Sequence, residues 1–167
     1  MSTLWEEICQ DPKFQDLPYK IELNRFGQII MSPATARHGN FQSNLAHLLK
    51  TLMPGGDTFT ELGVETSDSV KVADVAWASD ERCAIIENQS SASIAPEICV
   101  EVKSPSNSRA EIAIKCQLYL DAGALEFWHC DQEGRLTFFD RDGTLEFSRL
   151  CPQFPNMLPR RQPRKAS

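Results

Sequence analysis

Residues 97–108, EICVEVKSPSNS, combine an expected β-strand, a pair of charged side chains and a turn. Every second residue of the first part is apolar: Ile98, Val100 and Val102. This period of two predicts a strand with one apolar face, and it places Glu101 and Lys103 together on the opposite face. Two interpretations remain open for that pair. It is either an ordinary exposed pair at a strand edge or part of a metal-dependent active site.

The segments before this strand have equally clear patterns. Residues 19–32 alternate around a turn at 24–27 and predict a β-hairpin. Residues 36–53 predict a helix, because its apolar residues follow helical spacing: Phe41, Leu45, Leu48, Leu49 and Leu52. A short strand is expected within 57–66, and residues 70–78, VKVADVAWA, predict a stronger one.

The segments after it continue the alternation of strands and helices. Residues 109–122 predict a helix that Ser108 and Glu111 begin with a capping box and Gly123 ends. Strands are expected at 125–130, 135–140 and 144–150, the last two joined by a turn at Asp142-Gly143. The sum is an α/β (α+β) fold, in which helices flank one mixed central sheet and a hairpin precedes it.

Composition indicates one globular domain, which we place at residues 1–150. The chain has 167 residues, of which 41% are apolar and 24% charged. It lacks a long apolar run and a signal-like N-terminus, so we expect a cytoplasmic protein that does not enter a membrane. The six cysteines contain no CxxC pair, and we expect them to be small, reduced core residues.

The net charge of −6 argues against a simple nucleic-acid binder, but the charge is unevenly distributed. The last residues carry basic side chains and no acidic one: Arg149, Arg160, Arg161, Arg164 and Lys165. We interpret residues 151–167 as a basic, proline-rich, flexible tail. Contact of this tail with a phosphate backbone is the alternative.

Asp74 lies inside an otherwise apolar strand, where a carboxylate is costly unless it is paired, protonated or bound to a metal. If the strands of Asp74 and Glu101 are neighbours, the two carboxylates repel each other, and a divalent cation between them removes that repulsion. Oxygen ligands favour Mg²⁺, with Mn²⁺ as a substitute. Such a cation activates water and stabilises charge on a phosphate, and a nearby lysine orients or deprotonates that water. A hydrogen bond from Asp74 to a turn is the structural alternative.

Two helical pairs add candidates for the same site. Lys115 and Tyr119 are four residues apart on the second helix and share a face, from which Lys115 can reach phosphate. His38 and Gln42 have the same spacing on the first helix, where they can reach the outer shell of a metal. Surface or boundary positions are the alternative for both pairs.

The motif Asp74 followed by Glu101-Val102-Lys103 resembles the PD-(D/E)xK signature of restriction-endonuclease-like nucleases, with Ala73 in place of the usual proline. The chain resembles more closely the Uma-type family of “putative restriction endonucleases”, a former domain of unknown function. The matching stretches span residues 19–150 and occur in the family's order: YKIELNRFGQIIMSPA with RHGNFQSNLAHLL, VKVADVAW, PEICVEVKSPSNS and KCQLYLDAGALEFWHCD.

The resemblance implies a restriction-endonuclease-like core in which Asp74 and Glu101 bind the metal. It implies Lys103 as the catalytic lysine, with Lys115 on the following helix as its rival. His38 matches a recurrent histidine of the family, and Ser104 follows the motif as the family's serine does. Gln42 stands where many related nucleases have a glutamate, which puts a second metal site in doubt.

We therefore expect a Mg²⁺-dependent DNA endonuclease that leaves a 5′-phosphate. The acidic composition implies either weak DNA affinity as a monomer or a homodimer that assembles a basic groove. A catalytically silent member that binds nucleic acid or protein is the alternative, and hydrolysis of RNA or a small nucleotide is the third.

Overall fold

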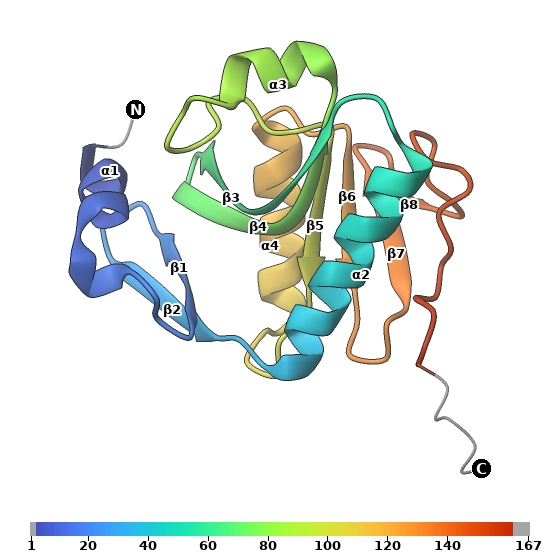
Figure 1. Cartoon of the computed structure of the whole chain (residues 1–167), viewed down its shortest axis with the longest axis horizontal. Coiled ribbons are helices and arrows are strands. Elements are labelled where there is room, and N and C mark those ends of the chain that lie inside the picture. Colours follow the sequence, from blue (N-terminus) through green and yellow to red (C-terminus); the bar gives the residue numbers. More distant parts are fainter. Residues whose placement is uncertain (1–2, 162–167) are drawn as a thin grey trace.

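A six-stranded sheet crosses the centre of the molecule in the computed structural model, which describes residues 3–161 (Figure 1). The strands follow one another in chain order: β3 (Asp57–Thr66), β4 (Ser69–Ala78), β5 (Ile98–Val102), β6 (Glu126–Cys130), β7 (Leu136–Asp140) and β8 (Gly143–Leu145). Only the pair β5 and β6 is parallel, and the other neighbours are antiparallel. The predicted mixed sheet is therefore confirmed.

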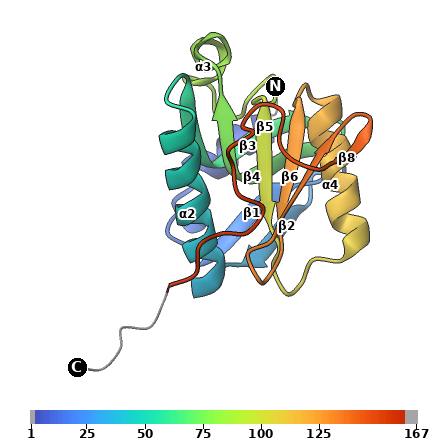
Figure 2. The same cartoon turned by 90° about the vertical axis from the view of Figure 1, so that its right-hand side faces the viewer.

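Helices cover both faces of this sheet, as Figure 2 shows with the sheet seen between them. Helix α2 (Ala36–Leu52) packs on one face through Leu45 and Leu49, which are fully buried against β4, β5 and β6. Helix α4 (Arg109–Asp121) packs on the other face through Tyr119 and Leu120. Thr35 caps α2, and the predicted capping box of Ser108 and Glu111 begins α4. Both helices end within a residue of the prediction.

The predicted N-terminal hairpin forms a separate two-stranded sheet of β1 (Tyr19–Leu23) and β2 (Ile29–Pro33). Leu23 is fully buried beside Val72 at the start of β4, where α1 (Thr3–Gln10) also packs, followed by the short 3-10 helix η1 (Pro12–Phe14). Lys71 Nζ donates a hydrogen bond to the Leu23 carbonyl oxygen at 3.0 Å. These contacts hold β1 against β4, and β4 is the neighbour of β5 in the central sheet.

The structure differs from the sequence-based prediction in three elements. Helix α1 and helix α3 (Asp80–Ile86) were not predicted, because each is short and packs through few apolar residues. The last strand was expected at 144–150, but β8 ends at Leu145. The backbone N–H groups of Arg149 and Leu150 donate instead to the buried Glu126 carboxylate, at 2.8 and 3.1 Å, and so cannot extend the sheet.

The C-terminal segment also differs from the flexible tail that we expected. Cys151, Phe154 and Leu158 are buried in the core on the α2 side of the sheet. Residues 162–167, which include Arg164 and Lys165, lie outside the described residues. Of the cysteines expected in the core, Cys9 is exposed on α1. No helix among residues 3–161 is long and apolar enough to cross a membrane.

Candidate active site

Asp74 on β4 and Glu101 on β5 face the same buried space, as the two strand patterns predict. The antiparallel register pairs Val75 with Val100, so the two acidic residues lie side by side at the end of the paired region. Asp74 is 1% exposed and Glu101 is 2% exposed. Asp74 Oδ2 accepts a 2.7 Å hydrogen bond from the Val102 backbone N–H, which ties the aspartate to the neighbouring strand.

The hairpin brings a lysine between these carboxylates. Lys20 Nζ lies 3.0 Å from Glu101 Oε2 and 3.1 Å from Asp74 Oδ1. The ammonium group lies between the two buried acids, in the position that a bound metal ion would take. Lys20 was not among the predicted site residues, because only the tertiary packing of β1 on β4 brings it here.

Helix α4 supplies a second lysine and a tyrosine. Lys115 Nζ lies 2.8 Å from Oε1 of Glu22 on β1 and 3.3 Å from Glu101 Oε2. Tyr119 Oη donates to Glu101 Oε1 at 2.8 Å. The predicted pair on α4 therefore meets the predicted glutamate. Glu22 was missed, although it alternates with Lys20 on the predicted hairpin strand and so shares a face with it.

Helix α2 contacts Asp74 from the other side. His38 Nε2 lies 3.3 Å from Asp74 Oδ2. Gln42 Nε2 donates to the backbone carbonyl of Asp74 at 3.0 Å, so it holds the strand rather than the carboxylate. Both predicted residues of this helix thus reach Asp74, each in a different way.

Lys103 and Ser104 lie outside this cluster. Strand β5 ends at Val102, and Lys103 lines a neighbouring cavity together with Arg109 and His129. Ser104 is buried in the loop that follows, where its hydroxyl donates to Asn107 Oδ1 at 2.8 Å. The structure therefore brings Lys115, not Lys103, to the carboxylates.

The charges of the cluster compensate one another. Burial alone would lower the pKa of Lys20, but Glu101, Asp74 and Glu22 outweigh it and raise that pKa well above its ordinary value. Burial would raise the pKa of Asp74, yet Lys20 and His38 hold it below its usual range. For Glu101, burial dominates and raises the pKa despite Lys115 and Lys20. The site is thus a neutralised network in which Glu101 is the carboxylate most easily protonated.

Asp74 and Glu101 have the donor chemistry for a hard divalent cation such as Mg²⁺. Asp74 Oδ1 is buried and receives no hydrogen bond of good geometry, although Lys20 Nζ is near. Within residues 3–161, however, no group of three or more Asp, Glu, His or Cys side chains is arranged to hold a metal. The cavity beside the carboxylates measures about 20 Å³, room for a single water molecule. A cation fits the ligands here only if Lys20 moves away.

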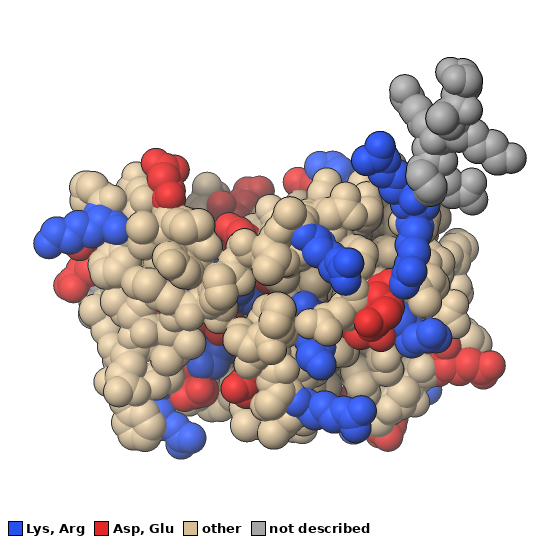
Figure 3. Space-filling view, turned by 90° about the horizontal axis from the view of Figure 1, so that it is seen from below, with Lys and Arg blue, Asp and Glu red and all other residues tan. Residues whose placement is uncertain are grey.

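Basic side chains are spread over the face seen from below, with acidic side chains between them (Figure 3). The residues that line three adjoining cavities include Arg37, Lys103, Arg109, Arg160 and Arg161. Acidic residues of the same region, Asp131 and Glu133, belong to the turn between β6 and β7. Around these three cavities the basic lining residues outnumber the acidic ones by five to two, although the net charge of the chain is negative.

Comparisons with known proteins agree with this architecture. Residues 6–160 match the Uma2 family, described as “Putative restriction endonuclease”. A crystal structure described as a “putative nuclease belonging to DUF820” from Anabaena variabilis ATCC 29413 superposes with a TM-score of 0.69 and 22% sequence identity. The match covers 86% of this chain and 83% of that one, and at this identity it shows a shared fold. A search of curated proteins gave no match.

Proposed function

The chain belongs to the Uma2 family, and from this premise we propose that it is a metal-dependent endonuclease that hydrolyses phosphodiester bonds in DNA. The observation that carries the proposal is that buried Asp74 and Glu101 lie side by side and that Lys115 contacts Glu101. Two acids that can hold a divalent cation, and a lysine that can offset charge on a phosphate, are groups suited to phosphodiester hydrolysis. The basic side chains around the adjoining cavities favour a polyanionic substrate.

Asp74 and Glu101 are the residues that would hold Mg²⁺ or Mn²⁺. When bound, the cation would lower the pKa of a water molecule and offset charge on the phosphate. In hydrolysis, a water oxygen bonds to phosphorus, the bond to the 3′-oxygen breaks, and that oxygen takes up a proton. The products are a 5′-phosphate and a 3′-hydroxyl.

The side chains around the acids would each have a distinct role in this reaction. The Lys115 ammonium would hold the attacking water or offset charge on a non-bridging phosphate oxygen. Tyr119 would fix the orientation of Glu101 through its 2.8 Å hydrogen bond. His38, which lies 3.3 Å from Asp74 Oδ2, would do the same for Asp74.

A catalytically silent DNA-binding protein is the second candidate, and one observation favours it. Lys20 Nζ lies 3.1 Å from Asp74 and 3.0 Å from Glu101, so it offsets the charge of the two acids without any metal. In that case the acids and lysines would stabilise the folded protein, and the basic face would bind nucleic acid without cleaving it.

Cleavage of supercoiled plasmid in Mg²⁺ or Mn²⁺ separates the two candidates. We expect nicking by the wild type that requires the metal and is lost in Asp74→Ala and Glu101→Ala. Asp142→Ala is the matched control, because Asp142 is exposed in the turn between β7 and β8. Equal nicking by all four proteins would reveal a contaminating nuclease. Binding of plasmid without nicking by the wild type would favour the silent protein.

A further inference from the structure

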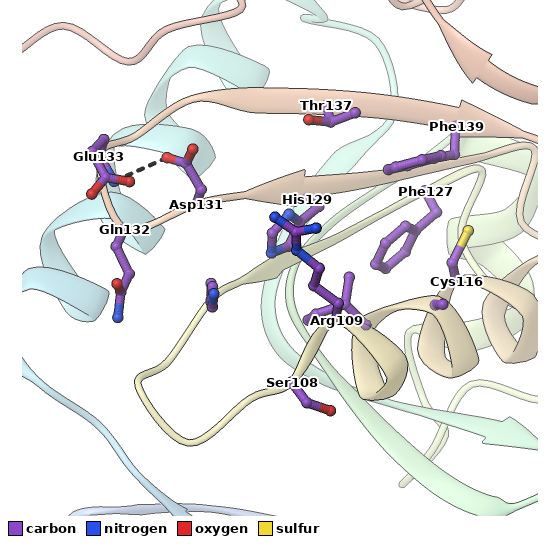
Figure 4. Close-up of a pocket in the computed structure, with 13 residues that line it drawn as sticks. Ser108, Arg109, Cys116, Phe127, His129, Asp131, Gln132, Glu133, Thr137 and Phe139 are labelled. Atoms are coloured by element: carbon purple, nitrogen blue, oxygen red, sulfur yellow. Dashed lines mark hydrogen bonds between the residues drawn. The ribbon is translucent and has the colours of Figure 1, made fainter.

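A well-formed cavity near the carboxylates lies between α4 and the strands β6 and β7 (Figure 4). Its volume is about 550 Å³, within the range of small-molecule sites and far above the 20 Å³ beside Asp74 and Glu101. The proposed catalytic residues do not line it, apart from Lys103, which the sequence pattern had placed in the active site. The cavity therefore needs an explanation of its own.

One end of this cavity is apolar and aromatic. Phe127 and Phe139 lie there with ring centroids 6.1 Å apart, beside Ile112 and Cys116 of α4 (Figure 4). Phe139 is partly exposed, so its ring is open to contact from the cavity. A flat aromatic ligand, such as a nucleobase, can stack or pack at such an end.

The middle of the cavity carries nitrogen groups that lack protein partners. Among residues 3–161, neither Lys103 Nζ nor the Arg109 guanidinium has a hydrogen bond or an ion pair. His129 Nε2 is buried and also lacks a hydrogen-bond partner. Burial lowers the pKa of His129; Asp131 opposes this shift and Lys103 adds to it, so the ring is neutral near pH 7. The two cationic side chains without protein partners suit a phosphate group. The imidazole nitrogen without a hydrogen-bond partner suits a polar group on an aromatic ring.

This cavity continues toward the carboxylate cluster. Lys103 and Gln132 line it and also line a smaller cavity of about 260 Å³. His38 in turn lines both that smaller cavity and the space beside Asp74 and Glu101. Lys103 is two residues beyond Glu101, or about 7 Å of extended chain. A strand whose phosphate lies at the carboxylates would thus pass close to Lys103.

We propose that this cavity binds one nucleotide of the substrate strand, next to the bond that is cleaved. Lys103 and Arg109 bind its phosphate, and the base lies against Phe139 near His129. The inference rests on the proposed nuclease function and narrows its substrate. A base inside the cavity cannot be paired or stacked in a duplex, so the substrate is a single strand, a frayed end or a flipped nucleotide.

Calorimetry with 2′-deoxyadenosine 5′-monophosphate in EDTA tests binding without catalysis. We expect the wild type and Asp74→Ala to bind the nucleotide, and Arg109→Ala and Lys103→Ala each to weaken binding at least tenfold. Arg135→Ala, which removes an exposed arginine that does not line the cavity, should bind as the wild type does. Ala113→Trp should block the cavity from the exposed face of α4, whereas Ala110→Trp on the same helix should not. Circular dichroism confirms that each variant is folded.

The outcomes separate this inference from the proposed function. No binding by the wild type, or equal binding by Arg109→Ala, Lys103→Ala and Ala113→Trp, overturns the nucleotide site even if plasmid is cleaved. Equal affinity for inorganic phosphate and for the nucleotide would overturn the assignment of a base to the aromatic end. Nucleotide binding that these variants weaken, with no cleavage of plasmid or of a single-stranded oligonucleotide in Mg²⁺ or Mn²⁺, would support the site and refute the nuclease.

Discussion

Lys20 is the residue that most changes the interpretation of the site. Two buried carboxylates repel each other, and the usual account of such a pair is a metal ion between them. Here an ammonium group lies 3.0 and 3.1 Å from the two acids and supplies that positive charge. A metal that binds the same oxygens must displace Lys20, so the protein cation and the metal compete for one position.

Replacing Lys20 with methionine should therefore strengthen metal binding. We expect Lys20→Met to bind Mn²⁺ at least tenfold more tightly than the wild type in calorimetry, a gain of about 1.4 kcal/mol. Without metal, the uncompensated acids should destabilise the variant by about 3 kcal/mol in urea unfolding. Saturating Mn²⁺ should restore much of this loss, because a ligand that binds only the folded state stabilises it.

Lys50→Met is the control for this prediction, since Lys50 is 71% exposed in its ion pair with Asp57. It should leave both Mn²⁺ affinity and stability near the wild-type values, because exposed ion pairs contribute little. Weaker or unchanged Mn²⁺ binding by Lys20→Met would show that the ammonium group does not compete with the metal.

At the scale of elements, β5 and α4 decide which lysine serves the acids. Strand β5 ends at Val102, and Lys103 lines the cavity beside His129, not the space beside Asp74 and Glu101. Helix α4 packs across the sheet and brings Lys115 within 3.3 Å of Glu101. The helix reaches this place because the capping box at Ser108 fixes where it begins.

Kinetics of Lys115→Met and Lys103→Met should distinguish the two lysines. Lys115→Met should lower the single-turnover cleavage rate about 100-fold or more, because it removes a cation from the reacting centre. Lys103→Met should raise KM more than it lowers kcat, because Lys103 lines the neighbouring cavity. A loss of cleavage rate in Lys103→Met but not in Lys115→Met would show that Lys103 is the catalytic lysine.

The sequence predicted the elements with strong periodicity and the site residues that those elements carry. Asp74, Glu101, Lys115 and Tyr119 meet because strand and helix faces follow from local spacing. Lys20 and Glu22 were out of reach for a different reason: the hairpin that carries them docks through tertiary contacts with β4, such as the 2.9 Å bond from Val72 N to Glu22 Oε1. The spacing of apolar and polar residues within a hairpin does not indicate which strand of another sheet that hairpin will pack against.

The whole molecule combines a negative net charge with a locally basic face. The chain carries −6 overall, yet the cavities beside the cluster are lined by arginines from α2 and from the C-terminal segment. Arg160 reaches this face because Leu158 is buried, and its Nη2 donates to the Glu133 carbonyl oxygen at 3.1 Å. The part of the C-terminal segment that we expected to be a tail is thus held beside the proposed substrate path.

Salt dependence should report how many of these cations contact phosphate. Fluorescence anisotropy measures the binding of a single-stranded oligonucleotide in EDTA. We expect the logarithm of the association constant to fall linearly with the logarithm of the salt concentration. Each cation that contacts a phosphate contributes about 0.7 to the slope. Arg37→Ala and Arg160→Ala should each reduce the slope by about that amount. Arg25→Ala, which removes an arginine paired with Asp68 on the hairpin turn, should leave it unchanged. A wild-type slope that none of the variants alters would place the nucleic acid on another face of the molecule.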